Sequence, residues 1–169
     1  YLPWTEARDK DAILSTMLVC EMTGYYKKQG KSLLDALKDI HERVGYFVDN
    51  SYSIVLEGLE GKAKIAEIMD SFRNDYSKEI GESKLIKVSD FLEGSVTSLD
   101  DDKVEDTNLH RENVMKYEFD NESWYALRPS GTEPKLKVYI SARGGSKEEA
   151  GLKVSAIKEV VDNRMEKLL

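Results

Sequence analysis

Three short alternating segments between residues 114 and 142 constrain the fold more than any other feature of the chain. They are Val114–Phe119, Trp124–Leu127 and Leu136–Ala142. In the last one, every second residue from Leu136 is apolar and the residues between are mostly polar, which is the pattern of a strand with one buried face. Short links join antiparallel strands, because parallel strands need a long crossover. The chain is therefore predicted to contain an antiparallel sheet.

Two amphipathic helices are predicted to pack on this sheet. Residues 59–76 carry apolar side chains at helical spacing, and a long helix follows Ser146, for which Glu149 can complete a capping box. The side chains expected to face the sheet are Ala63, Ala66, Met69, Phe72 and Tyr76 in the first helix and Ala150, Val154, Ile157, Val161, Met165 and Leu168 in the second.

Two further strands are expected before residue 90, at Tyr52–Leu56 and Leu85–Val88. Residues 94–112 are mostly polar and no strand is predicted in them. The acidic run Asp100–Asp106 within this segment is expected to be a solvated surface loop and not a cation site. The predicted order is β-α-β-β-β-β-α. The sequence thus predicts an α+β fold of two layers, an antiparallel sheet covered on one face by two helices.

The first part of the chain has a different character. Ala12–Tyr26 is apolar on most sides, and Ser32 can cap a second helix that ends at Gly45. A helix that is apolar nearly all round is normally buried by other structure. We therefore expect Cys20 to be a core residue, and Met17 and Met22 with it. Because two helices cannot bury the first one, we interpret residues 1–48 as the end of one domain and residues 49–169 as a second domain.

Composition excludes several kinds of function. The net charge is −7, and no cluster of Lys and Arg is visible that could displace counterions from a nucleic acid. No apolar run is long enough to span a membrane, and no secretory signal opens the chain. Cys20 is the only cysteine, which fits a reducing compartment. We expect a cytoplasmic protein without nucleic-acid or membrane partners, which could bind an anion only through a local cationic pocket.

One such pocket is predicted in the loop between the last two strands, where residues 128–135 read Arg-Pro-Ser-Gly-Thr-Glu-Pro-Lys. The planar guanidinium of Arg128 can bond two phosphate oxygens at once. Ser130 and Thr132 supply hydroxyl donors, and Gly131 lets backbone N–H groups approach a ligand closely. Ser, Gly and Pro also favour ordinary turns, so residue types alone leave open a plain hairpin loop with charges in water.

This octapeptide resembles the phosphate-binding loop of the α-D-phosphohexomutase family, whose pattern is Arg-x-Ser-[Gly/Asn]-Thr-x-Pro. The segment Asn113–Leu127 resembles the hairpin that leads into that loop, and residues 8–46 resemble the end of the family's third domain. The likeness covers nearly the whole chain. It implies a phosphoglucomutase/phosphomannomutase C-terminal fragment: a fourth domain with a TATA-box-binding-protein-like α+β fold, preceded by a helical remnant of an α/β domain.

The resemblance also implies a function. In such isomerases a phosphoserine exchanges phosphate with the 1- and 6-positions of a hexose phosphate, with Mg²⁺ as cofactor and glucose 1,6-bisphosphate as intermediate and activator. The family's phosphoserine, Mg²⁺ and sugar-recognition motifs are not found in this sequence. We therefore expect no catalytic residue and no metal ligand here, no activity of the fragment alone, and the remaining domains of the same polypeptide as partners. The residues implied in substrate-phosphate binding are Arg128, Ser130, Gly131, Thr132, Lys137 and Lys10.

Three alternatives remain open at the level of sequence. The sugar could be that of a phosphopentomutase or phosphoglucosamine mutase, since sugar choice depends largely on a loop outside this chain. The chain could also be a non-catalytic phosphosugar-binding module, or a purely structural α+β domain. His41 and His110 are isolated from each other and from other ligands in the sequence, so they predict no metal site.

Overall fold

The computed structural model describes the chain except for residues 1–3, 6 and 8 and the side chain of Leu59. It divides into two compact units, Tyr1–Gly45 and Tyr46–Leu169. The second unit begins before the predicted domain start at residue 49, because its first strand already begins at Tyr46.

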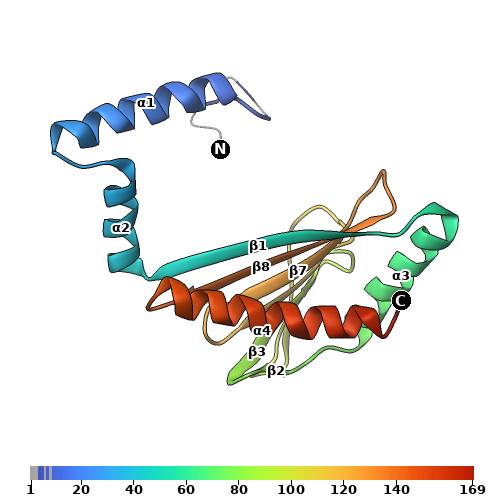
Figure 1. Cartoon of the computed structure of the whole chain (residues 1–169). Helices are drawn as coiled ribbons and strands as arrows, with labels where there is room; N and C mark the ends of the chain where they lie inside the picture. Colours follow the sequence, from blue (N-terminus) through green and yellow to red (C-terminus); the bar gives the residue numbers. More distant parts are fainter. Residues whose placement is uncertain (1–3, 6, 8) are drawn as a thin grey trace. The chain divides into compact units, whose positions relative to one another are not determined.

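The first unit contains two helices, α1 (Ala12–Lys28) and α2 (Leu33–Val44), coloured blue in Figure 1. The Asp11 carboxylate accepts a hydrogen bond from the Leu14 N–H at 2.9 Å and so caps α1. Ser32 and Asp35 cap α2 reciprocally, with distances of 2.8 and 3.1 Å between side chain and backbone. Both predicted helices are confirmed.

The prediction that Cys20 is a core residue is wrong for the described chain. No residue of α1 is buried, Cys20 is exposed, and Met17 and Met22 are 63% and 42% exposed. An apolar helix needs a covering layer on each apolar side. Within the described part of its own unit, α1 has only α2 to pack against.

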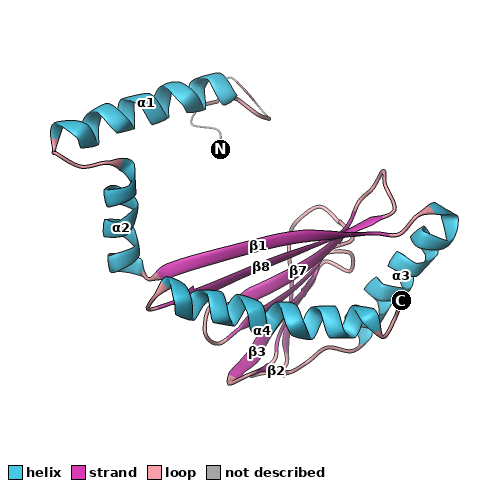
Figure 2. Ribbon diagram, viewed as in Figure 1, coloured by secondary structure: helices cyan, strands magenta, loops and turns pink. Residues whose placement is uncertain are grey.

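The second unit is an α+β domain, as predicted (Figure 2). Its strands form one antiparallel sheet in the order β1-β8-β7-β6-β3-β4-β5, with β2 paired to β3 beside this path. The elements are β1 (Tyr46–Val55), α3 (Gly58–Asn74), β2 (Glu79–Ile80), β3 (Ser83–Asp90), β4 (Ser95–Ser98), β5 (Lys103–Asp106), β6 (Met115–Phe119), β7 (Trp124–Pro129), β8 (Lys135–Gly144) and α4 (Lys147–Glu166).

The segment 94–112, in which no strand is predicted, contains two strands, and β5 covers part of the run Asp100–Asp106 that is predicted as a solvated loop. β4 pairs with β3 and with β5 over four residue pairs each. Both strands are half-buried or exposed throughout, so they carry no alternation of apolar and polar residues. Their pairing follows from the free edge that β3 offers, which is a tertiary property and is invisible in the local sequence.

Helices α3 and α4 lie on one face of the sheet and enclose the core with it (Figure 1). In α4 the predicted stripe from Ala150 to Met165 is buried. In α3 the predicted face is partly wrong: Ala63 and Ala66 are exposed, and Ile65 and Ile68 are buried in their place. The larger side chains at positions 65, 68, 69 and 72 remove more apolar area from water than the alanines, so they set which side of the helix faces the sheet.

The two helices of this unit are also joined to each other. The guanidinium of Arg164 in α4 donates to the backbone oxygen of Ser71 in α3 at 2.8 Å and lies 4.4 Å from the ring centre of Phe72. Ser146 caps α4 by accepting from the Glu149 N–H at 3.1 Å. The Glu149 carboxylate accepts from the Gly145 N–H at 2.8 Å, one residue before the position that a capping box would use.

Candidate functional site

The predicted phosphate loop joins β7 to β8 and is held by its own backbone. The Ser130 N–H donates to the Lys135 oxygen at 2.7 Å, and the Lys135 N–H donates to the Glu133 oxygen at 2.8 Å. The Ser130 hydroxyl oxygen accepts from the Glu133 N–H at 3.3 Å, which leaves its hydrogen free to donate to a ligand. The Leu56 N–H donates to the Pro134 oxygen at 3.0 Å and ties the loop to the start of α3.

Arg128 and Lys137 lie directly opposite each other on β7 and β8. Their neighbours Leu136 and Val138 are buried against the helices, so both cations project from the opposite face of the sheet, which we call the outer face. Both are exposed, and neither forms an ion pair with any residue that the structure describes. Like charges at directly opposite positions are destabilising. An anion placed beside both would remove that repulsion.

Lys135 is the third cation of the loop region, and the carboxylate of Glu133 compensates its charge. The Lys135 ammonium lies 2.7 Å from a carboxylate oxygen of Glu133. The hydrogen bond and the charge of Lys135, followed by the charge of Lys137, lower the pKa of Glu133 below its ordinary value. The cations left for an added anion are therefore Arg128 and Lys137. Gly131 and Thr132 are exposed at the tip of the loop, where they can meet the same anion.

On its other side the loop borders a cavity of about 230 Å³. The Lys62 and Asn113 side chains line it together with Ser130 and Gly131. Asn113 is fixed by Arg73, whose guanidinium donates to the Asn113 amide oxygen at 3.0 Å. Sequence reasoning missed Lys62 and Asn113, because only the packing of α3 beside the loop brings them there.

Lys10 belongs to the first unit. It is exposed and lies 3.0 Å from an oxygen of the adjacent Asp9 carboxylate. Its assignment to the phosphate site stays a prediction.

The other candidates have local explanations. His41 contacts the Gly45 oxygen at 3.2 Å and His110 contacts the Arg111 oxygen at 3.0 Å. Among the residues that the structure describes, no group of three or more His, Cys, Asp and Glu side chains could hold a metal ion. Within that same part of the chain, no helix is both long enough and apolar enough to cross a membrane.

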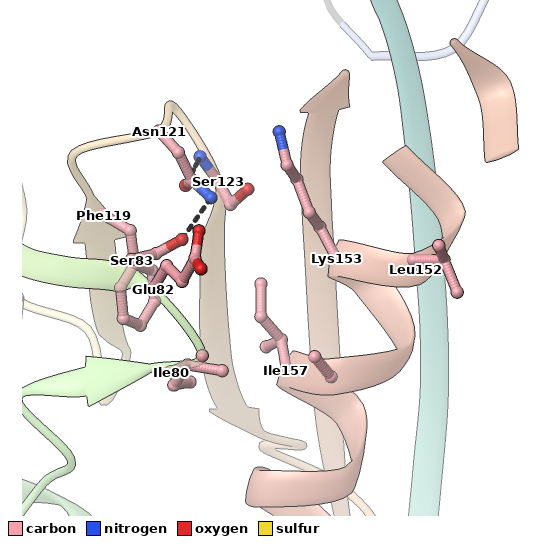
Figure 3. Close-up of a pocket in the computed structure, with 11 residues that line it drawn as sticks. Ile80, Glu82, Ser83, Phe119, Asn121, Ser123, Leu152, Lys153 and Ile157 are labelled. Carbon is pink, nitrogen blue, oxygen red and sulfur yellow. Dashed lines mark hydrogen bonds between the residues drawn. The ribbon is translucent and has the colours of Figure 1, made fainter. Parts of the chain in front are cut away.

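A larger cavity of about 280 Å³ lies between α4 and the turn joining β6 to β7 (Figure 3). Ile80 and Ile157 form apolar walls, and the buried Ser123 hydroxyl has no hydrogen-bond partner among the described residues. Lys153, the cation at this cavity, already contacts Glu149 at 2.7 Å. Because its walls are apolar and its cation is neutralised, this cavity suits a phosphate ester poorly. It also lies at the opposite end of β7 from Arg128.

Comparison with known proteins agrees with the fold. Residues 61–159 match the family described as phosphoglucomutase/phosphomannomutase, C-terminal domain. The chain is 46% identical over 134 residues to a phosphoglucomutase of Staphylococcus epidermidis, which covers 79% of this chain and 24% of the relative. It is 41% identical over 150 residues to a phosphoglucomutase of Staphylococcus aureus, covering 89% and 27%. The chain thus spans about a quarter of the length of these relatives.

A solved structure supports the fold separately. The phosphoglucomutase pp63/parafusin from Paramecium, in its open form, superposes with a TM-score of 0.59 at 12% identity, covering 95% of this chain and 28% of that protein. The family match extends over more than half of the chain, from α3 to most of α4, and includes the whole loop between β7 and β8. The chain therefore belongs to the phosphoglucomutase/phosphomannomutase family and contains its C-terminal domain.

Proposed function

We propose that this chain is the part of a phosphoglucomutase that holds the substrate phosphate while phosphoryl transfer takes place in other domains. The observation that carries the proposal is the exposed pair Arg128 and Lys137, which face each other across two strands without an acidic partner among the described residues. A dianionic phosphate ester supplies the charge that this pair lacks.

Each residue of the loop has a distinct role in this proposal. The Arg128 guanidinium binds two phosphate oxygens in its plane, and the Lys137 ammonium adds a point charge. The Ser130 and Thr132 hydroxyls donate to the remaining oxygens, and Gly131 leaves room for the backbone to approach. These residues, Arg128, Ser130, Gly131, Thr132 and Lys137, together form what we call the phosphate clamp. The phosphate clamp holds whichever phosphate is not reacting. Its binding energy is used to position the sugar for transfer at the other end.

The remaining parts of the proposal concern the whole protein. Residues 1–48 form the end of the third domain, from which Lys10 reaches the same phosphate, and residues 49–169 form the fourth domain. The reaction interconverts hexose 1- and 6-phosphates in the cytoplasm, with glucose as the first sugar to test and mannose as the second. Mg²⁺ would supply Lewis-acid assistance to the transfer. We assign its ligands to other domains, because the family's Mg²⁺ motif is not found in this sequence.

The test is an NMR titration of the chain with glucose 6-phosphate, inorganic phosphate and glucose. We expect the amides of residues 130–132 to shift with both phosphate ligands and not with glucose. The affinity should be about millimolar, because one part of the cleft is present. Arg128→Ala should abolish the shifts, whereas Arg43→Ala on α2, also an exposed arginine, should not. Glucose-induced shifts at the loop, or full binding by Arg128→Ala, would contradict the proposal.

Catalysis gives a second readout. Incubated with glucose 1-phosphate and Mg²⁺, the purified chain should form no glucose 6-phosphate, since the phosphoserine motif is not in its sequence. Turnover by the chain alone would show that a nucleophile is present in it.

A further inference from the structure

The outer face of the sheet continues beyond the phosphate clamp in a regular way. Tyr139 lies two residues after Lys137 on β8 and therefore projects from the same face. Its direct neighbours across the strands are Ser51 on β1 and Ala126 on β7, and both are small. The Tyr139 ring is thus flanked by short side chains, which leave one side of it open to a ligand.

A cavity of about 270 Å³ lies beside this ring. The Asp49, Ser51, Trp124 and Tyr139 side chains line it. The Lys116 ammonium lies 5.1 Å from the ring centre of Trp124 and occupies one face of that ring. Tyr139 has no such cation or ring contact with a described residue, so its ring is the aromatic surface that remains available. The cavity therefore combines an open aromatic face with a carboxylate and a hydroxyl.

The spacing between clamp and ring suits one class of ligand. Two residues of a strand span about 7 Å. In a hexose 6-phosphate one oxygen and one carbon join phosphorus to the pyranose ring, and the far side of that ring lies at a comparable distance from phosphorus. With its phosphate between Arg128 and Lys137, such a molecule reaches the cavity with its sugar ring. An aromatic face is electron-rich and attracts the polarised C–H groups of a pyranose, while Asp49 and Ser51 can bond its hydroxyls.

We infer that Tyr139, Ser51 and Asp49 form a subsite for the pyranose ring of the phosphate ester held by Arg128 and Lys137. The inference rests on the proposed function and adds a sugar contact within this domain. The Asp49 carboxylate also gives the subsite a preference, because it repels a second anionic group on the sugar. A hexose phosphate with an uncharged pyranose fits, and one whose pyranose carries a carboxylate, such as glucuronic acid 1-phosphate, does not.

The experiment compares glucose 6-phosphate with inorganic phosphate on the whole chain by NMR titration. Glucose 6-phosphate should shift the amides of Ser51 and Tyr139 in addition to those of the loop, and inorganic phosphate should shift the loop alone. Tyr139→Ala should weaken glucose 6-phosphate roughly three- to tenfold and leave inorganic phosphate within about twofold. Tyr139→Phe, which keeps the ring, should bind both ligands as the parent does. Asp49→Asn should weaken glucose 6-phosphate and improve glucuronic acid 1-phosphate.

The outcomes separate the two proposals. If neither phosphate ligand shifts the loop of the parent chain, the proposed function fails and the sugar subsite fails with it. If inorganic phosphate shifts the loop while glucose 6-phosphate adds nothing at Ser51 and Tyr139, the clamp stands and the subsite is overturned. Equal loss of both ligands in Tyr139→Ala, without rescue by Tyr139→Phe, also overturns the subsite, because it indicates damage to the strand itself.

Discussion

At the scale of single residues, we expect the Glu133 carboxylate to lower the affinity of the phosphate loop for an anion. Its carboxylate lies 2.7 Å from the Lys135 ammonium and places a negative charge within the site that we propose for an anion. Glu133→Gln removes that charge and releases Lys135. We expect glucose 6-phosphate to bind about two- to fivefold more tightly at low ionic strength, with the gain shrinking as salt screens exposed charges. Titrations at low and high salt measure it.

Glu122→Gln is the matched control for this prediction. Glu122 is also exposed and pairs with Arg143 at 2.5 Å, but it stands in the turn before β7, at the other end of the strand from the loop. Its replacement should leave the affinity unchanged. An unchanged affinity in Glu133→Gln would mean that Lys135 does not act on the bound phosphate.

At this scale, the sequence was informative where a function depends on consecutive residues. Arg128 near the end of β7 and Ser130, Gly131 and Thr132 in the loop that follows lie together because they are neighbours in the chain. The alternation of side chains along a strand also predicted that Lys137 lies on the same side as Lys135. The positions of Lys62 and Asn113 could not be predicted, since they border the loop only after α3 has packed on the sheet.

At the scale of elements, Gly61 matters for the beginning of α3, which runs from Gly58 to Asn74. A Cβ added at Gly61 would lie 2.0 Å from the backbone oxygen of Leu56, so the backbone would have to shift. We expect Gly61→Ala to destabilise the protein by about 1–3 kcal/mol, although alanine favours helix. Because the Leu56 N–H bonds to the loop at Pro134, phosphate affinity should fall as well. Urea unfolding and a phosphate titration measure both effects.

Gly151 in α4 provides the contrast. A Cβ there meets no atom within 4 Å, so Gly151→Ala should raise the free energy of unfolding, by at most about 1 kcal/mol from helix propensity. Loss of stability in both variants would contradict the prediction, because it would show that the approach to Leu56 is not what distinguishes position 61.

The elements with strong local patterns were predictable. Apolar and polar residues alternate in the strands between residues 114 and 142, and α4 has an apolar stripe at helical spacing. The structure confirms both predictions. β4 and β5 were not predictable, because their residues are half-buried or exposed throughout and form strands only by pairing with a neighbour. The face of α3 was misjudged because Ala63 and Ile65 both count as apolar, although the isoleucine has far more area to bury.

At the scale of the whole molecule, two buried tyrosines make stability depend on alkaline pH. Tyr117 and Tyr125 are 0% and 2% exposed, and their rings stack with centres 4.5 Å apart. Burial raises the pKa of both above the ordinary value of about 10. Unfolded tyrosine ionises above that pH while the folded ring stays neutral. Stability is therefore complete below pH 10 and should fall above it, by about 1.4 kcal/mol per pH unit for each ring.

Urea unfolding between pH 8 and 11.5 measures this slope. Tyr117→Phe removes one ionising group and should make the slope less steep by about 1.4 kcal/mol per pH unit. It should also lower stability at pH 8 by about 1 kcal/mol, through the lost 2.7 Å bond from the Tyr117 hydroxyl to the Phe72 oxygen. Tyr25→Phe, at an exposed ring of α1, is the control and should change neither value. A slope that Tyr117→Phe leaves intact would assign the alkaline loss to other groups.

The division into two units gives a further prediction. Every residue of the main hydrophobic core lies between Val48 and Leu168, within the second unit. Residues 46–169 alone should therefore unfold in one cooperative transition and keep the phosphate-induced shifts of residues 130–132. Circular dichroism melting and the NMR titration test this. A broad, non-cooperative melt of residues 46–169 would show that the helices α1 and α2 contribute to the fold of the sheet domain.

The exposure of Cys20 on α1 has a practical consequence for spectroscopy. It is the only thiol in the sequence, so a maleimide dye or a nitroxide will react at one position and report on the first unit alone. Replacing exposed Lys103 on β5 by cysteine would add one attachment point on the second unit. Energy transfer or electron–electron coupling between the two labels would then give the distance distribution between the units, with and without a bound phosphate ester.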